Sequence, residues 1–314
     1  MNIQQLEYIL AVDEHRHFAR AADACFVTQP TLSMMIQKLE EELDVRIFDR
    51  TRHPVAPTLI GSKIIAQARL TLDCIRQIKE IVAEEKGFLH GTFRLGIIPT
   101  IAPYFLPLFL PRFVASYPGL QLVIHEMITS QSIENVIRGS IDGAILATPL
   151  NEARLTEHPL YYERFFAYVS DSMPCSEKAT LGIDDIDGGR LWLLEEGHCF
   201  RSQILHYCNL RKKAPPGEEE NIVYQAGSIE TLIRMVDQHG GMTIIPEMAI
   251  RYLNPEQQQQ LKPFSDPMPV REISLVTRND FIRQRMVDAF RGETRQVLPS
   301  NMTSGELKTF IVEI

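Results

Sequence analysis

The chain has 314 residues, 45% of them hydrophobic, and a formal net charge of −8 at pH 7. This length allows two or three domains with cores of their own, and no run approaches the roughly 20 apolar residues of a membrane-spanning helix. The acidic balance excludes a generally basic surface, so binding to nucleic acid would have to rest on local positive groups and helix N-termini.

The N-terminal residues "MNIQQLEYILAVDEHRHF" lack the basic and apolar regions of a signal peptide. We therefore expect a cytoplasmic protein without a membrane partner. Such a compartment keeps cysteines as thiols by default, so any disulfide would be conditional. The chain has five cysteines, too few and too unevenly spaced for a secreted disulfide framework: Cys25, Cys74, Cys175, Cys199 and Cys208.

Apolar residues recur three and four positions apart in the first sixty residues, which predicts three short amphipathic helices. Between the second and third helix, Thr28 is a suitable N-cap, and Pro30 is tolerated only in a first helical turn. A tight turn at this point predicts a helix-turn-helix. The apolar positions are Leu6, Ile9, Leu10, Phe18, Ala21, Ala22, Cys25, Leu32, Met35, Ile36, Leu39 and Leu43.

The third helix is expected to read DNA, because polar side chains near its N-terminus suit base edges and phosphates. The segment "VRIFDRTRHPVAPTLIG" that follows predicts a wing of two strands around a basic loop that carries Arg50 and Arg52. A small helical interaction domain is the alternative, since residues 1–60 hold six basic against nine acidic side chains. The candidate contact residues in the third helix are Gln29, Pro30, Thr31, Ser33, Met34 and Lys38.

The stretch "LEYILAVDEHRHFARAADACFVTQPTLSMMIQKLEEELDVRIFDRT" resembles the winged helix-turn-helix of LysR-type transcriptional regulators. An alanine pair, a Thr-Gln-Pro-Thr-Leu helix start and a Lys-Leu-Glu end occur in the order found in that family. The resemblance implies that residues 1–57 form a DNA-binding domain for double-stranded DNA. RNA polymerase is then a further expected partner.

Residues 58–87 continue as one helical pattern with an apolar stripe spaced mainly four and three apart. A helix packed on its own domain is one interpretation of this stripe. A linker that pairs with a second chain is the other, and the family resemblance implies it. A homodimer or homotetramer would present two DNA-binding heads to a roughly palindromic site. The stripe consists of Ile64, Ala68, Leu72, Ile75, Ile78 and Val82.

From Thr92 onward, strand patterns alternate with helical ones, which predicts an α/β domain over residues 88–298 followed by a tail, 299–314. The resemblance implies two Rossmann-like subdomains of the periplasmic-binding-protein type II kind, with residues 92–162 and 268–298 in the first and 163–267 in the second. Ligands bind between such lobes at strand ends, where Thr100 and Thr129 are expected. The expected strands are "FRLGIIP", "LQLVIHE", "DGAILAT", "LWLLE", "NIVYQ", "MTIIP" and "REISLVT", and helical spacing marks 130–139 and 228–239.

The segment "EEGHCFRSQILHYC", residues 195–208, holds Cys199 and Cys208 nine positions apart. In one helix these Cα atoms would be ~13.5 Å apart, whereas a disulfide needs roughly 4.4 to 6.8 Å. A bond between them would therefore require the helix to open. Two buried structural thiols are an alternative, and a zinc site that also uses His198 and His206 is another, although the spacing fits no common zinc motif.

Cys199 falls near the expected start of this helix, where the helix dipole favours a thiolate. Arg201 and His198 would add positive charge, while Glu195 and Glu196 act in the opposite direction. The residues alone leave the direction of the thiol pKa shift open.

"LWLLEEGHCFRSQILHYC", together with "GSIETLIRMV" and "GGMTIIP", resembles the peroxide-sensing branch of the LysR-type regulators. The resemblance implies that Cys199 reacts with hydrogen peroxide and that Cys208 resolves the product. It also implies a regulator of oxidative-stress genes that needs no cofactor and no metal and is not an enzyme. It places four pocket residues around the peroxide: Thr100, Thr129, His198 and Arg201.

An effector-binding regulator with idle cysteines is the competing hypothesis, and a thiol peroxidase a weaker third. The loop 209–221 and the tail after residue 298 have no clear counterpart in the resemblance. Cys25, Cys74 and Cys175 lie outside the redox segment and are interpreted as structural.

Overall fold

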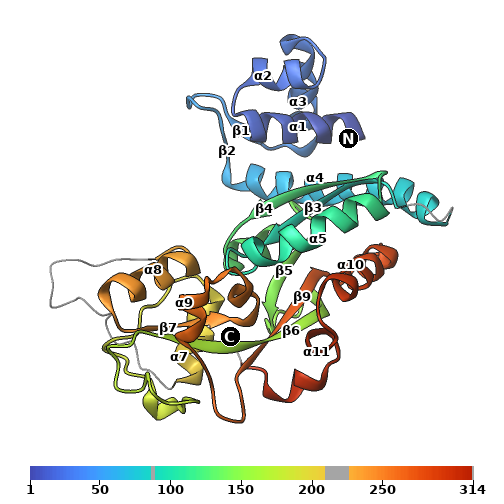
Figure 1. Ribbon diagram of the computed structural model, residues 1–314. Coiled ribbons are helices and arrows are strands. Elements are labelled where there is room, and N and C mark those ends of the chain that lie inside the picture. The colour runs from blue at the N-terminus through green and yellow to red at the C-terminus, as the bar shows by residue number, and fades with distance from the viewer. Residues whose placement is uncertain (86–88, 209–225, 313–314) are drawn as a thin grey trace. The chain divides into compact units, whose positions relative to one another are not determined.

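The structure, a computed structural model, describes residues 1–85, 89–208 and 226–312 (Figure 1). The chain divides into two compact units, the first built mainly on Met1–Gly87 and the second on the residues from Phe88 onward. None of the described helices is both long enough and apolar enough to cross a membrane. The loop 209–221 lies outside the described residues.

The first unit begins with the three predicted helices, α1 (Ile3–His15), α2 (Phe18–Ala24) and α3 (Gln29–Leu43). The side chain of Thr28 accepts the backbone N–H of Thr31 at 3.4 Å, and Pro30 lies in the first turn of α3, as predicted. The apolar faces of the helices meet in a core in which Ile9, Leu32 and Ile36 are fully buried. The helix-turn-helix is therefore held together by the packing of the apolar faces that the sequence periodicity predicted.

A two-stranded wing follows, with β1 (Phe48–Asp49) antiparallel to β2 (Ala56–Pro57). Glu40, on α3, is 2% exposed and accepts the backbone N–H groups of Ile47 at 2.7 Å and Phe48 at 3.3 Å. This buried carboxylate fixes the wing against the helix, because it satisfies two amides at the start of the strand.

The long helix α4 (Leu59–Glu85) carries the predicted stripe, but the stripe has two environments. Ala68 is 3% exposed within the core of its own unit, and Ile64 and Leu72 pack partly against that core. Ile78 and Val82 are 62% and 53% exposed. Ala68 was expected to pair with a second chain, but the side chain is already buried in the core of its own unit.

The second unit is built on a mixed sheet with the strand order β4-β3-β5-β9-β6-β7, and β8 pairs with β6 beside this path. β3 is parallel to β4 and β5, and the pairs β5–β9, β9–β6, β6–β7 and β6–β8 are antiparallel. The strands are β3 (Gly91–Ile97), β4 (Leu120–Glu126), β5 (Gly143–Thr148), β6 (Leu155–Val169), β7 (Met242–Pro246), β8 (Leu261–Pro263) and β9 (Val270–Arg278).

β6 and β9 are shared by both halves of this sheet and run side by side in Figure 1. β6 pairs with β9 from Leu155 to Arg164 and then with β7 from Phe165 to Val169. The predicted strand at 191–195 is present only as isolated bridges at Leu191 and Leu194, and the one at 221–225 falls outside the described residues.

Helices cover the sheet, and α5 packs its aromatic face inward. Phe105, Phe109 and Phe113 stack successively, with ring centroids 4.9 and 4.8 Å apart, while prolines four residues apart occupy the exposed side. The helices are α5 (Ala102–Ser116), α6 (Thr129–Ile137), α7 (Cys199–Tyr207), α8 (Ile229–His239), α9 (Pro255–Gln259), α10 (Gln284–Val297) and α11 (Ser300–Thr303), with short 3₁₀ turns η1 (Ile183–Asp185), η2 (Glu247–Tyr252) and η3 (Glu306–Phe310).

Candidate redox site

α7 begins at Cys199 and ends at Tyr207, and Cys208 is its C-cap (Figure 1). Both cysteines are free thiols, each 5% exposed. An α-helix of this length separates the two Cα atoms by ~13.5 Å. The predicted single helix is thus confirmed, and its geometry is incompatible with a disulfide until the helix opens.

Gly197 brings the start of α7 close to the start of α6. Its φ of +99° is one that residues with a Cβ rarely adopt, and a Cβ there would lie 3.2 Å from Cδ1 of Ile128. Thr129, the first residue of α6, is 9% exposed, and its hydroxyl makes no hydrogen bond of ordinary geometry. A buried hydroxyl whose hydrogen-bonding capacity is not used up is available both to the neighbouring thiol and to a small polar ligand.

Burial raises the pKa of the Cys199 thiol, because desolvation disfavours the thiolate. The Thr129 hydroxyl, the Arg271 guanidinium and the backbone amides of Phe200 and Ala147 all act in the opposite direction. The sequence left this direction open, and in the structure burial outweighs the groups that favour the anion. Reaction of Cys199 therefore depends on those opposing groups.

Arg271, on β9, is the buried cation of the site and is 0% exposed. It donates from Nη1 to the Thr100 hydroxyl at 3.1 Å and from Nη2 to the Thr100 carbonyl at 3.0 Å. Its Cζ lies 4.8 Å from the ring centroid of Phe200, the residue after Cys199. Arg271 thus binds Thr100, a predicted pocket residue, and also contacts α7, the helix that begins at Cys199.

Glu163, on β6, is the counter-ion of Arg271 and is 1% exposed. Its Oε1 accepts from Nε and Nη2 of Arg271, both at 2.8 Å, and its Oε2 accepts the backbone N–H of Met248 at 3.2 Å. Burial raises the pKa of Glu163, while Arg271 lowers it. Neither Glu163 nor Arg271 was singled out in the sequence, although an arginine inside the apolar strand "VREISLVT" was a usable signal.

His198 and Arg201 differ in how they relate to the thiol. His198 is 4% exposed and precedes Cys199 as N-cap, with Nε2 3.7 Å from Oε1 of Glu195. Nη1 of Arg201 donates to the Leu194 carbonyl at 2.8 Å, and Arg201 is not among the groups that shift the pKa of Cys199. The cation expected of Arg201 is supplied by Arg271 instead.

Burial raises the pKa of the Cys208 thiol to about 12, with no opposing effect from a neighbouring charge or hydrogen bond. His206 is exposed, whereas His198 and both thiols are buried, so the four candidate zinc ligands do not share one face. Within residues 1–85, 89–208 and 226–312, no cluster of His, Cys, Asp and Glu side chains is arranged to hold a metal ion.

The candidate DNA contacts lie where α3 and the wing are exposed, as expected for Gln29, Pro30, Thr31, Met34 and Lys38. Ser33 is half-buried and accepts Nη1 of Arg50 at 3.2 Å. Arg50 also pairs with Glu40 at 3.2 Å, so it braces the wing in addition to any phosphate contact. Arg52 is 72% exposed and pairs with Asp49 at 3.2 Å.

Two family descriptions match the two units. Residues 3–62 match the bacterial regulatory helix-turn-helix protein, lysR family, and residues 86–299 match the LysR substrate binding domain. The chain belongs to the LysR family of bacterial regulators.

Within this family the chain is OxyR-like. It is 36% identical over 306 residues to a hydrogen peroxide-inducible genes activator of Haemophilus influenzae, which covers 95% of this chain and 99% of that one. It is also 36% identical over 281 residues to the DNA-binding transcriptional dual regulator OxyR of Escherichia coli, with 88% and 90% covered.

Solved structures agree with this assignment. A full-length OxyR variant from Pseudomonas aeruginosa superposes with a TM-score of 0.78 at 32% identity and covers 95% of this chain and 99% of its own. A Corynebacterium glutamicum OxyR cysteine-to-serine mutant, described as H2O2-bound, superposes with a TM-score of 0.63 at 27% identity, with 100% and 97% covered.

Proposed function

We propose that this protein is a DNA-binding transcriptional regulator that senses hydrogen peroxide through a reversible disulfide between Cys199 and Cys208. The observation that carries the proposal is the site at the start of α7, where a buried thiol lies under the influence of the buried Thr129 hydroxyl and the cation of Arg271. The similarity to peroxide-inducible activators and to a peroxide-bound OxyR structure supports it. DNA binding would place the protein in the cytoplasm.

The chemistry consumes one peroxide for two thiols. The Cys199 thiolate attacks one peroxide oxygen, an S–O bond forms, the O–O bond breaks, and the leaving oxygen departs as water after protonation. Thr100 and Thr129 are proposed to hold the peroxide, with His198 at the same end of α7. Cys208 then attacks the sulfur of the sulfenic acid, so that an S–S bond forms and a second water leaves.

Disulfide formation opens α7, because helical geometry keeps the thiols apart. We propose that the regulatory half, residues 88–298, repacks as a result and moves the DNA-binding heads, residues 1–57, through the linker 58–87. The expected outcome is altered transcription of oxidative-stress genes by RNA polymerase. Each chain would react once per signal, so the thiols serve as a switch and not as a turnover enzyme.

Mass spectrometry of the peroxide-treated protein, digested under alkylating conditions, tests this function. We expect a loss of two free thiols per chain and a cross-linked peptide that joins Cys199 to Cys208. The competing hypothesis, a regulator that binds a small organic anion between the lobes, predicts unchanged thiols after peroxide and a thermal shift with organic anions.

The Arg52→Ala variant is expected to bind all DNA sequences more weakly and to reduce the slope of log K against log salt by about one, because a phosphate contact is lost. Arg52 is the better choice than Arg50, which also braces the wing through Glu40. Thr51→Ala is the matched control in the same loop. An unchanged salt slope in the Arg52→Ala variant would contradict the assignment of the wing.

The Ile78→Asp variant should dissociate the homo-oligomer, because a charge would face the apolar surface of a partner helix. Ile78 is 62% exposed in the chain, so the substitution spares the core of its own unit, which Leu72 partly joins. Sedimentation analysis measures the result, and Gln67→Asp adds the same charge at an exposed polar position of α4. A variant that keeps the oligomeric state of the native chain would show that the exposed half of the stripe is not the interface.

A further inference from the structure

The C-terminal segment, residues 306–312, crosses the start of β9 and reaches α7. Ile311 forms a parallel bridge with Val270, and the backbone N–H of Val312 donates to the Val270 carbonyl at 2.8 Å. The carbonyl of the same residue, Val312, accepts Nε2 of Gln203 at 3.0 Å. One residue of the tail therefore joins the strand that carries Arg271 to the helix that carries both thiols.

Gln203 lies midway between the two cysteines and is 0% exposed. It is four residues after Cys199, so both side chains lie on the buried face of α7. The Oε1 atom of Gln203 has no hydrogen-bond partner. The bond to Val312 is thus the hydrogen bond that holds this buried amide in place.

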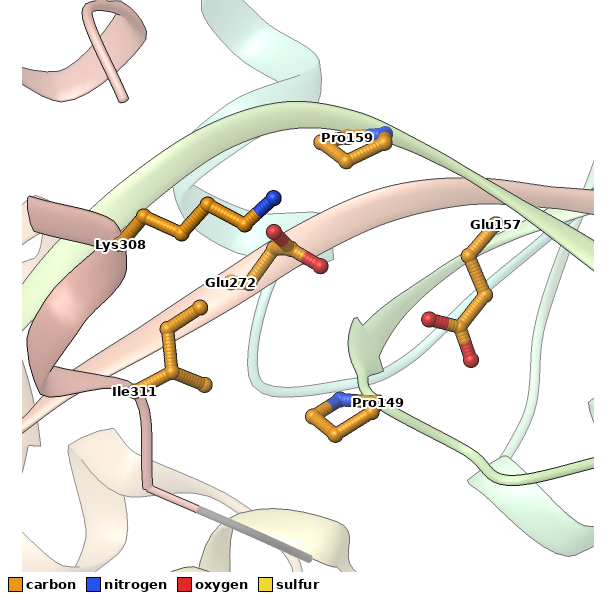
Figure 2. A pocket seen from close by; sticks show the side chains of 6 residues that line it. All are labelled: Pro149, Glu157, Pro159, Glu272, Lys308 and Ile311. Atoms are coloured by element: carbon orange, nitrogen blue, oxygen red, sulfur yellow. The ribbon is translucent and has the colours of Figure 1, made fainter.

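The tail has further contacts at the same place. Val312 is 8% exposed and belongs to the hydrophobic core of the second unit. Lys308 and Ile311 line a cavity of about 410 Å³ beside Glu272, the neighbour of Arg271. Figure 2 shows the amino group of Lys308 directed toward the Glu272 carboxylate. Opposite charges and apolar packing both favour the docked position of the tail.

We propose that Gln203 and Val312 are positioning residues for the redox switch, through which the C-terminal segment holds α7 in its dithiol conformation. This inference rests on the proposed function, because it assigns the segment a role in that same disulfide exchange. The tail thereby sets how strongly the protein resists oxidation.

The dithiol conformation is the one that can contain the hydrogen bond between Gln203 and Val312. Cys199 and Cys208 can form a disulfide only after the helix between them opens, and Gln203 belongs to the part that must move. The Gln203–Val312 hydrogen bond therefore stabilises the dithiol form, and it is absent from the disulfide form, in which α7 has opened. Removing it leaves the buried Val312 carbonyl without its donor, which destabilises the dithiol form alone.

Equilibration of the purified full chain with reduced and oxidised glutathione measures this effect. One oxidised glutathione accepts the two electrons of Cys199 and Cys208, so the chain gains an S–S bond and two reduced glutathione molecules are released. Alkylation followed by mass spectrometry gives the fraction of disulfide. The variants are Gln203→Leu, a chain that ends at Lys308, and the combination of both.

Each single variant is expected to favour the disulfide about fivefold to tenfold over the native chain. A tenfold change lowers the midpoint potential by about 30 mV for this two-electron couple. In the shortened chain, Gln203→Leu should add no further shift, because its partner is already gone. Ser202→Ala, at an exposed neighbour on α7, should keep the potential of the native chain.

Native potentials in both single variants would overturn the inference, as would fully additive effects of the two changes. If the native chain forms the Cys199–Cys208 disulfide and the variants have the same midpoint potential as the native chain, this inference alone is overturned. A native chain that forms no Cys199–Cys208 disulfide in any buffer overturns the proposed function as well. Circular dichroism of the reduced variants checks that they are folded, and Gln203→Leu keeps the test independent of the truncation.

Discussion

The Cys199→Ser variant should lose the peroxide response completely, whereas Cys208→Ser should still consume one peroxide per chain. The reason is that Cys199 makes the first attack and a serine hydroxyl is too weakly ionised near neutral pH to replace it. In the Cys208→Ser variant the sulfenic acid has no resolving thiol, so a dimedone probe should trap it at Cys199. Thiol titration and mass spectrometry after peroxide measure both outcomes.

The environments of the two sulfurs support this asymmetry. Burial raises the pKa of Cys208 to about 12, and none of the groups that favour a thiolate at Cys199 acts on it. It becomes a useful nucleophile only after α7 opens. Equal rates of thiol loss in the two serine variants, or dimedone labelling of Cys208 in place of Cys199, would contradict the assigned roles.

The Arg271→Met variant is expected to react with peroxide at least tenfold more slowly at neutral pH. Arg271 lowers the pKa of Cys199 against the effect of burial, and a rise of one pKa unit in a mostly protonated thiol reduces the thiolate about tenfold. Because the thiolate is the reactive form and burial raises the pKa of Cys199, the rate in the native chain should rise as the pH is increased above neutral. In the variant the same curve should move to higher pH.

Loss of Arg271 also leaves Glu163 as an unpaired buried carboxylate, which costs about 3–5 kcal/mol. The double variant Arg271→Met with Glu163→Gln removes this unpaired negative charge. The reaction of the double variant with peroxide should stay slow if the Arg271 cation acts on the thiol. It should return to the native rate if the unpaired Glu163 carboxylate alone slows the Arg271→Met variant. Glu163→Gln by itself should shift the pH curve of Cys199 to lower pH, since the guanidinium charge is then less compensated.

The helix-turn-helix could be predicted closely, because its helices bury one face against each other and the apolar period records that face. Thr28 and Pro30 mark the start of α3 through local backbone chemistry alone. The contacts of Arg50 could not be predicted, since its partner Glu40 is brought to it by the packing of the wing on α3. Local patterns predict elements well and long-range ion pairs poorly.

In the regulatory half, the major elements that were not predicted are β6, α5 and α10. β6 interleaves polar residues such as Glu163 and Arg164 with aromatic ones, because its two ends belong to different parts of the sheet. α5 contains prolines at 107 and 111, which normally disfavour a helix interior. Its stacked phenylalanines pack on the core and override that local preference.

The redox site was found in part. The sequence singled out Cys199, Cys208, Thr129 and Thr100. In the structure Thr129 acts on the Cys199 thiol directly, and Arg271 acts on that thiol while it binds Thr100. Arg271 was missed because it lies on β9, far along the chain from Cys199. Its apolar neighbours in the sequence indicate that it is buried, but they do not identify the thiol as its partner. A buried cation is defined by what surrounds it in space, which a single sequence does not record.

The shared strands β6 and β9 have a mechanical consequence. β6 is one strand of 15 residues and spans about 50 Å. It pairs with the nine-residue strand β9 with one register shift between Pro159 and Tyr161. Two paired strands resist bending at a single point but allow twist along their length. We expect a distortion imposed on one half of the sheet to be transmitted to the other half, because both halves share these two strands. Reduction of the disulfide would remove the distortion, and the shared strands would return the two halves to their original orientation.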